Sequence, residues 1–556
     1  MKKLYIIINL LIVAAVAAAQ PSWVKKATKS VFTLKTFAAD GALVASSSGF
    51  FTGEQGEAVS SFSPFRGAAS AIIIDAQGKE MPVVCMLGAN DTYDVAKFRV
   101  DVKKTVPLPL AAGSAAENTT VWLLPYRETK HVPQGTIRKA EPFKSAYTYY
   151  TVAMDMPEGT ASCPLMNEAG EVIGLMQQPY LQGDTLNYAV SALFADSLTI
   201  NGLSINDPTL RSTAIKKDLP TDLGQATLTL YLAQATLDSA AYAQLTDDFI
   251  ARFPNSPDGY TYRAQAAASA KHFAAAANDM EQAIKLADKK DEAHFSYSKL
   301  IYQKEIQMPD DPFEGWSLDK ALEEARAAER LNPTMAVYRH QQAVILFAPK
   351  KYQEAADVYA SIANSELRSP ELFYEASRCK AMQQDTLGQI ALLDSCVAMF
   401  SQPYLKEVAP YLMARAQVLM DAQRYRQAVG DLNEYEKLMQ ATVNANFYYL
   451  RFQAEVGGRL FQQALNDINQ AIRMVPEYDL YYAEKASLQV RVGLYDEAIE
   501  TSKECIQIAP DHSDGYLFLG IAQCLKGQKT EGVQNLKKAR ELGDTQADDL
   551  IEKYSK

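Results

Sequence analysis

Residues 464–510, ALNDINQAIRMVPEYDLYYAEKASLQVRVGLYDEAIETSKECIQIAP, repeat their own spacing after 34 positions. A small residue, a second one seven positions later and a proline twelve positions later occur twice: Ala464, Ala471 and Pro476, then Ala498, Cys505 and Pro510. A fixed period of this length predicts stacked pairs of helices, because one pair alone cannot bury its apolar face. The small residues let two helices approach closely, and the proline ends the second helix.

The same small position recurs through the second half of the chain, at Ala276, Ala321, Ala355, Gly388, Ala428, Ala464, Ala498 and Gly532. This pattern resembles the tetratricopeptide repeat. It predicts an array over residues 225–545 that contains eight clear repeats and, before them, one weak unit around Tyr242 to Pro254. An insertion at 308–316 is placed between the helices of the second clear unit, as a surface loop or a partner contact. Residues 201–224 are a linker or cap, and 546–556 a C-terminal tail.

The resemblance implies an all-α right-handed superhelix whose concave face, formed by the first helix of each unit, binds a protein or peptide partner. The family's groove positions fall on Met413, Gln417, Tyr449, Gln453, Ala483 and Ser487. Tyr448 and Tyr482 are interpreted as helix-interface residues instead. The Lys/Asn/Arg clamp for a peptide carboxylate is absent, and the oligomeric state is open.

The first part of the chain has a different pattern, with short β runs separated by turn residues. Asp40-Gly41 marks a hairpin turn between two of these runs. The expected strands are Ser30–Phe37, Ala42–Phe51, Ala58–Phe62, Ala71–Asp75, Met81–Leu87, Ala96–Val100, Thr120–Leu124, Tyr147–Met154 and Val172–Met176. Nine or so strands without a long helix predict a closed or sandwiched β fold.

Short words within these strands resemble the trypsin-like, HtrA-type serine peptidases. They are SGFF (48–51), VSSFSPFRGA (59–68), TYDVA (92–96), GTASCPL (159–165), NEAGEVIG (167–174) and YAV (188–190). The resemblance implies an all-β trypsin-like double barrel over residues 27–200, so the chain is multidomain.

The family's catalytic triad falls on Ser63, Asp94 and Ala161. Peptide hydrolysis in this family needs a hydroxyl nucleophile, an imidazole base and a carboxylate that orients the imidazole. Of these only the carboxylate of Asp94 is present. The base position is Ser63, whose hydroxyl is no base near neutral pH, and Ala161 at the nucleophile position has no reactive atom. We therefore predict a catalytically silent domain, a pseudo-peptidase.

Other residues offer a rival chemistry. Ser162 and Cys163 replace the glycine pair behind the nucleophile position, and either side chain is a candidate nucleophile. His131 is the only histidine between residues 20 and 271, in a loop-like segment, and neither nucleophile has a placed base. The favoured interpretation is an interaction scaffold. The alternative is a serine or cysteine hydrolase whose repeats recruit substrates.

The N-terminus predicts export. Lys2 and Lys3 precede an apolar run over residues 4–16, and Ala17-Ala18-Ala19 offers a cleavage site, so residues 1–19 are expected to be a signal peptide. The product is predicted to be periplasmic or extracellular, without a membrane span. A net charge of -11 argues against a nucleic-acid partner. No motif for a cofactor is present, and five histidines cannot build a plausible metal site.

Six cysteines in an exported chain raise the question of disulfides. In each of the pairs Cys379 with Cys396 and Cys505 with Cys524, the two cysteines are expected at different distances from the turn that joins their helices. The resulting separation along the helix axes is too large for a disulfide bond. These four are expected to be buried thiols. The pairing of Cys85 with Cys163 is open at this point.

Overall fold

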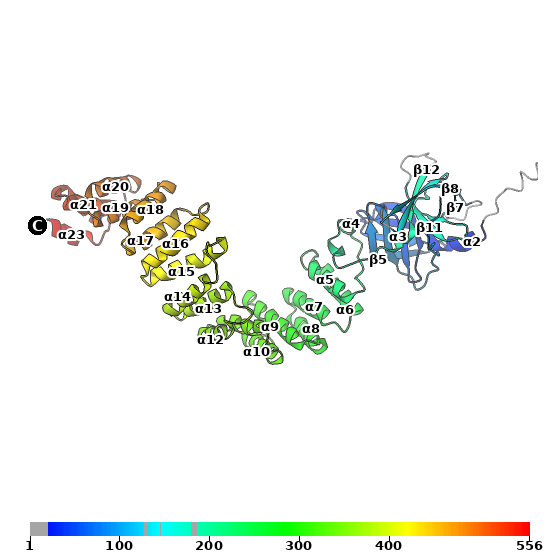
Figure 1. The fold of residues 1–556 in the computed structure, drawn as a ribbon, viewed down its shortest axis with the longest axis horizontal. Helices are drawn as coiled ribbons and strands as arrows, with labels where there is room; N and C mark the ends of the chain where they lie inside the picture. Colours follow the sequence, from blue (N-terminus) through cyan, green and yellow to red (C-terminus); the bar gives the residue numbers. More distant parts are fainter. Residues whose placement is uncertain (1–20, 127–131, 145, 179–185, 556) are drawn as a thin grey trace, which may run out of the picture. The chain divides into compact units, whose positions relative to one another are not determined.

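The computed structural model describes residues 21–126, 132–144, 146–178 and 186–555. The chain separates into two compact units, Met1–Ala287 and Asp288–Lys556. The first unit contains all of the β structure and the first helices, and the second is entirely helical where it is described (Figure 1). The predicted signal peptide lies outside the described residues.

The first barrel is closed, in the strand order β1-β2-β3-β6-β5-β4. Its strands are β1 Val31–Phe37, β2 Leu43–Phe51, β3 Glu57–Ser60, β4 Ser70–Ile74, β5 Glu80–Asn90 and β6 Val95–Val100. Phe32, Ile73 and Phe98 fill its interior without exposed surface. Gly49 on β2 faces the Phe32 ring, and a Cβ there would lie 2.6 Å from a ring carbon. The glycine of the SGFF word is therefore required by packing.

The second barrel is also closed, in the order β10-β11-β12-β9-β8-β7. Its strands are β7 Thr120–Leu123, β8 Gln134–Phe143, β9 Tyr147–Ala153, β10 Pro164–Met166, β11 Val172–Met176 and β12 Leu186–Ser191. Two closed six-stranded barrels confirm the predicted double-barrel fold. The estimate of nine or so strands was too low: the described residues form twelve. β8 carries charges and Pro142 on a largely exposed surface, and β10 has only three residues, so neither has a clear apolar alternation.

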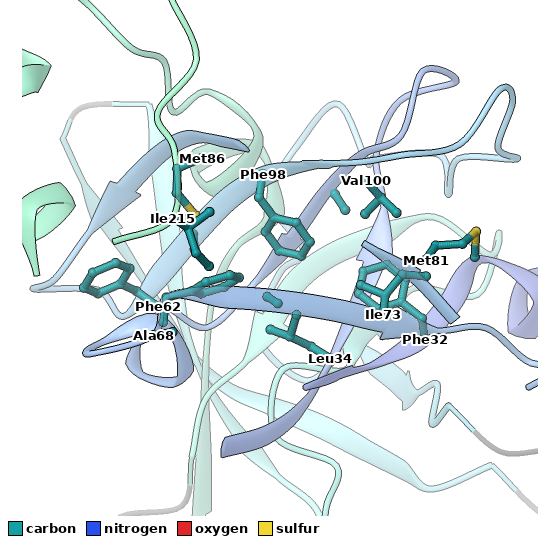
Figure 2. Packing of buried hydrophobic residues seen from close by; sticks show 14 of the residues in the cluster. Phe32, Leu34, Phe62, Ala68, Ile73, Met81, Met86, Phe98, Val100 and Ile215 are labelled. Carbon is teal, nitrogen blue, oxygen red and sulfur yellow. The ribbon is translucent and has the colours of Figure 1, made fainter. Parts of the chain in front are cut away.

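Residues 201–219 pack on the first barrel. Leu210, in α4 (Pro208–Arg211), belongs to its buried core. So does Ile215, which Figure 2 shows among the core side chains. The backbone adds hydrogen bonds that include those from the Ala214 amide to the Ala68 carbonyl and from the Met86 amide to the Lys216 carbonyl, 2.8 Å each. The segment that the sequence assigns to a linker or cap thus completes the barrel core.

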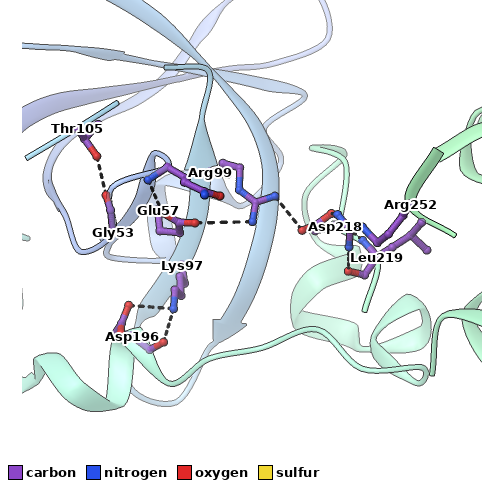
Figure 3. Close-up of polar contacts among 10 residues, drawn as sticks. Gly53, Glu57, Lys97, Arg99, Thr105, Asp196, Asp218, Leu219 and Arg252 are labelled. Carbon is purple, nitrogen blue, oxygen red and sulfur yellow. Dashed lines mark hydrogen bonds and ion pairs between the residues drawn. The ribbon is translucent and has the colours of Figure 1, made fainter. Parts of the chain in front are cut away.

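Ion pairs also connect the first barrel to the helices of the same unit. Asp218 accepts from Arg99 of β6 at 3.0 Å and from Arg252, the last residue of helix α6 (Ser239–Arg252), at 2.6 Å (Figure 3). Arg252 also donates to the Leu219 carbonyl. Because one carboxylate holds two guanidinium groups, the barrel and the first helices are joined through Asp218.

Two short helices belong to the barrel region, α2 Val24–Ala27 and α3 Ala192–Asp196. The longer helices follow one another in antiparallel pairs. In the first unit they are α5 Leu223–Ala233, α6 Ser239–Arg252, α7 Pro257–Ser269 and α8 Phe273–Leu286. In the second they are α9 Lys290–Gln307, α10 Leu318–Leu331, α11 Ala336–Phe347, α12 Tyr352–Ile362, α13 Pro370–Met382, α14 Thr386–Val397, α15 Ala409–Asp421, α16 Tyr425–Met439, α17 Ala445–Gly457, α18 Phe461–Met474, α19 Asp479–Arg491, α20 Tyr495–Ile508, α21 Ser513–Leu525, α22 Lys529–Glu541 and α23 Ala547–Ser555.

The small residues of the 34-residue period lie where helices meet. Six of them have no exposed surface: Ala276, Ala321, Ala355, Ala428, Ala464 and Ala498. At Gly532 a Cβ would lie 2.4 Å from the Cys524 sulfur, so this pair needs glycine. The insertion 308–316 lies between α9 and α10, and the residues expected to form a tail make α23, which packs on the last pair through Ala547.

All six cysteines are buried and free. This confirms the expectation for the four helical cysteines. It also settles the open case, because Cys85 lies in the first barrel and Cys163 in the core of the second without a bond between them.

Candidate functional site

Two of the three triad positions meet in the structure. Ser63 begins a short 3-10 helix, Ser63–Phe65, and Asp94 lies in the turn between β5 and β6. The Ser63 amide and hydroxyl both donate to Asp94 Oδ1, at 2.6 and 2.7 Å. Asp94 therefore holds a serine hydroxyl, at the two positions that the sequence resemblance assigns to the base and the carboxylate, and a neutral hydroxyl takes no proton at physiological pH.

The nucleophile position, Ala161, lies half-buried in the turn between β9 and β10. Its methyl group cannot attack a carbonyl or carry an acyl group. The nucleophile chemistry at this turn therefore depends on its two neighbours, Ser162 and Cys163.

Ser162 has no exposed surface, and the hydrogen bonds of its hydroxyl to the residues that the structure describes are all with serines. It donates to Ser61 Oγ at 2.7 Å, lies 2.9 Å from Ser47 Oγ and accepts from the Ser61 amide at 3.3 Å. Ser47 and Ser61 belong to the first barrel, so Ser162 joins the two barrels. The hydroxyl is buried, and among the described residues no imidazole or carboxylate is hydrogen-bonded to it to act as a base.

Ser162 also adopts a backbone conformation that favours glycine, with φ at 65°. We conclude that the hydrogen bonds to Ser47 and Ser61 hold a strained serine in place.

Cys163 is fully buried in the core of the second barrel. Burial raises the pKa of its thiol to about 11, although the Ser48 hydroxyl and the Tyr126 backbone act in the opposite direction. The thiol is therefore protonated near neutral pH. The thiolate, which is the nucleophilic form, is scarce there.

His131, the only histidine of the barrel region, lies outside the described residues. Among the described residues no group of three His, Cys, Asp or Glu side chains could hold a metal ion. None of the described helices is long and apolar enough to cross a membrane.

The predicted groove residues lie on three first helices, Met413 and Gln417 on α15, Tyr449 and Gln453 on α17, and Ala483 and Ser487 on α19. The prediction for Ala483 was wrong, because its side chain is buried in a core cluster of the helices. Gln417 and Gln453 are exposed, whereas Met413 is half-buried against the apolar core of its pair. The exposed glutamines are the two positions available to a partner without loss of packing.

Tyr449 makes packing contacts and a hydrogen bond that a solvent-facing groove residue would not make. Its ring stacks on Phe452 at 5.9 Å and meets Tyr481 at 5.3 Å, and its hydroxyl donates to Glu484 at 3.1 Å. Burial, together with the Glu484 charge, raises the pKa of Tyr449 to about 12. A substitution of Tyr449 therefore affects packing as well as any binding surface.

The sequence analysis missed a recurring buried ion pair. In three pairs an arginine of the first helix binds an aspartate sixteen residues later through two hydrogen bonds: Arg263 with Asp279, Arg415 with Asp431, and Arg451 with Asp467. The signal was present, since Arg and Asp hold fixed places in the 34-residue frame. The sequence analysis also missed Ser47, which directly precedes the SGFF motif, and Ser61, which lies within the motif that begins VSSFS.

Comparisons with known proteins bear on both parts of the chain. Residues 47–175 match the family model of a trypsin-like peptidase domain. The active form of the Rv3671c protease from M. tuberculosis is 18% identical, with a TM-score of 0.28, over 32% of this chain and 86% of that one. A serine endoprotease from Yersinia pestis is 16% identical, with a TM-score of 0.28, over 34% of this chain and 65% of that one.

The helical part is similar to the Small glutamine-rich tetratricopeptide repeat-containing protein 2 of Saccharomyces cerevisiae. The match is 28% identical over 95 residues, which is 17% of this chain and 28% of the yeast protein. The chain thus spans under a third of the length of this relative.

Proposed function

We propose that this chain, a trypsin-like peptidase domain followed by tetratricopeptide-like helices, is an exported interaction scaffold whose peptidase domain is catalytically silent. The observation that carries the proposal is the double hydrogen bond from Ser63 to Asp94. It leaves the triad carboxylate with a partner that cannot act as a base.

The two rival nucleophiles support the same conclusion. Ser162 is enclosed by serine hydroxyls, and Cys163 is a buried, protonated thiol. Loss of both base and nucleophile removes proton transfer and the covalent step together, which leaves only the weak effect of binding and oxyanion contacts.

The proposed binding surface is the first helix of each repeat, with Gln417 and Gln453 as exposed contacts. Helical repeats commonly bind extended peptides or helices along such faces. In the first unit the barrel is joined to the first helices through Asp218 and the core residue Ile215, so the barrel and the start of the helical array are parts of one folded unit. Export to the periplasm or beyond is part of the proposal and rests on the N-terminal pattern.

Activity probes separate the scaffold from the alternative hydrolase. The folded mature protein is treated with a fluorophosphonate and, separately, with iodoacetamide, and labelled peptides are mapped by mass spectrometry. We expect no fluorophosphonate label at Ser162, and an iodoacetamide label at Cys163 only after denaturation. Labelling of either residue that requires the folded state would favour the hydrolase.

The binding half of the proposal has its own test. The exported protein is used to capture partners from envelope extract, beside a variant with Gln417→Arg and Gln453→Arg. Since both side chains are exposed, the variant should fold normally and lose the captured protein. Undiminished capture by the variant would place the binding surface elsewhere.

A further inference from the structure

One buried charge cluster in the helical repeats is not balanced. In the pair α17–α18, the guanidinium of Arg451 binds Asp467 of α18 at 2.6 and 3.0 Å and Glu436 of α16 at 2.6 Å. A third carboxyl group, that of Glu455, lies four residues after Arg451 and so on the same face of α17. One cation therefore faces three carboxyl groups.

The place of Glu455 distinguishes this pair from the two other pairs that carry the buried arginine and aspartate. Four residues after the arginine, α7 has Ala267 and α15 has Leu419, which are both apolar. Glu455 is only 3% exposed, and its Oε2 has no hydrogen-bond partner within the described part of the chain. Its Oε1 lies 3.9 Å from Arg451 Nε, which is beyond hydrogen-bond distance. A carboxyl group thus occupies a place where the other pairs have an apolar side chain.

The surroundings of Glu455 favour its neutral form. Burial, and after it the Asp467 charge, raise the pKa of Glu455 to about 8, Arg451 acts in the opposite direction, and Glu436 raises the pKa further. Tyr448, on the same helix, donates to Glu436 and has its pKa raised to about 12, so it stays protonated while Glu455 titrates. Glu455 is therefore the group of this cluster that changes charge near neutral pH.

We propose that Glu455 is a proton-operated lock between α17 and the two helices packed against it, α16 and α18. While Glu455 holds its proton, the bonds of Arg451 tie α17 to both neighbours. Loss of the proton adds a buried negative charge beside two carboxylates, and opening of the α17–α18 pair lets water hydrate that charge. The lock does not depend on the proposed function, although α17 also carries the exposed contact Gln453.

The sign of the pH effect follows from the two states of the pair. In the open pair Glu455 titrates near its ordinary value of 4.5, and in the closed pair near 8. Between these values the open pair binds fewer protons, so each pH unit favours opening by up to about tenfold. Above pH 8 both states are ionised, and the effect levels off.

The test is hydrogen–deuterium exchange of the full mature protein, followed by mass spectrometry at pH 6, 7, 8 and 9. Protection is the ratio of the intrinsic to the observed exchange rate, so the direct effect of pH on exchange cancels. In peptides from residues 445–474 we expect protection to fall by up to about tenfold per pH unit from pH 6 to 8 and then to level off. Protection in Glu455→Gln should not fall in this way, so the difference between the two proteins should widen from pH 6 to 8.

Two further variants make the test specific. Glu455→Leu copies Leu419 of α15 and should also lose the pH dependence, which covers the case in which glutamine disturbs the fold. Glu500→Gln, at an exposed carboxylate of α20, should keep it.

Three outcomes would each overturn the lock. They are a fall in protection of less than about threefold from pH 6 to 8, the same fall in Glu455→Gln, and an equal fall in peptides from α7 and α8. The last outcome would mean that the opening is not local to α17 and α18. No partner is added in this experiment, so its result is independent of whether the proposed groove binds one.

Discussion

Glu455 is a single buried carboxyl group whose charge opposes folding. It lies on α17 with 3% of its surface exposed, and its Oε2 has no hydrogen-bond partner among the described residues. Arg451 Nε is 3.9 Å away but is engaged by Asp467 at 2.6 Å. Burial, and after it the Asp467 charge, raise the pKa of Glu455 to about 8, against the opposing effect of Arg451.

This pKa has a definite consequence for stability. The unfolded chain releases the Glu455 proton near pH 4.5, whereas the folded chain keeps it to about pH 8. Between these values the unfolded state binds fewer protons, so the free energy of unfolding falls as pH rises. Glu455→Gln should leave urea stability nearly unchanged at pH 5 and raise it by roughly 2 to 4 kcal/mol at pH 8. Glu281→Gln, at an exposed carboxylate, is the control; an equal gain at both pH values for Glu455→Gln would contradict the pKa.

Ser162 allows a second prediction for a single residue. Ser162→Ala loses the bonds to Ser47 and Ser61 and keeps the unfavourable φ, so the melting temperature should fall by an amount equivalent to about 1 to 3 kcal/mol. Ser162→Gly loses the same bonds but relieves the backbone, and should lose less. If alanine were tolerated better than glycine, the strain at this position would be disproved.

Among the elements, the two residues of the buried ion pair are either both present or both absent in a helical pair. Where the first helix has no arginine, the second has no aspartate: the pair α11–α12 carries Gln342 and Val358 at these places. Arg415→Gln alone should destabilise the array by about 3 to 5 kcal/mol, because Asp431 stays buried without its partner.

The double variant Arg415→Gln with Asp431→Val copies the combination found in α11–α12. It should recover much of the loss in a chemical denaturation experiment, since no uncompensated charge is left. Additive effects of the two substitutions would show that the pair is not coupled.

The sequence predicted those elements whose pattern is local. The 34-residue period predicts the helix pairs because each small residue lies where neighbouring helices meet. Among the predicted strands, β1, β6 and β7 alternate between buried and half-buried residues. β8 was not predicted because one of its faces is exposed and charged, so its sequence does not alternate between apolar and polar residues. The bond between Ser63 and Asp94 could be anticipated only as an alignment of positions, and the bonds of Ser162 to Ser47 and Ser61 join residues over 100 positions apart.

For the molecule as a whole, the sequence analysis ended the barrel domain at residue 200, which is too early. The motif resemblance stops near residue 200, where the composition turns polar. Leu210 and Ile215 nevertheless lie in the core of the first barrel, with 2% and 4% of their surfaces exposed. Two isolated apolar residues in a polar stretch carry no period, so their partners in space cannot be read from the sequence.

Two fragments test where the folded barrel domain ends. A fragment of residues 20–221 keeps Leu210, Ile215 and the ion pair of Asp218 with Arg99, and should give a cooperative thermal transition. A fragment of residues 20–200 loses both side chains from the core, at roughly 2 to 5 kcal/mol each, which is comparable with the whole stability of a small domain. It should therefore unfold at a much lower temperature or aggregate. In the full chain, Ile215→Ala should lower the barrel transition while the helical transition followed by far-ultraviolet circular dichroism changes little. Equal melting temperatures for the two fragments would mean that residues 201–221 only rest on a barrel that is already complete.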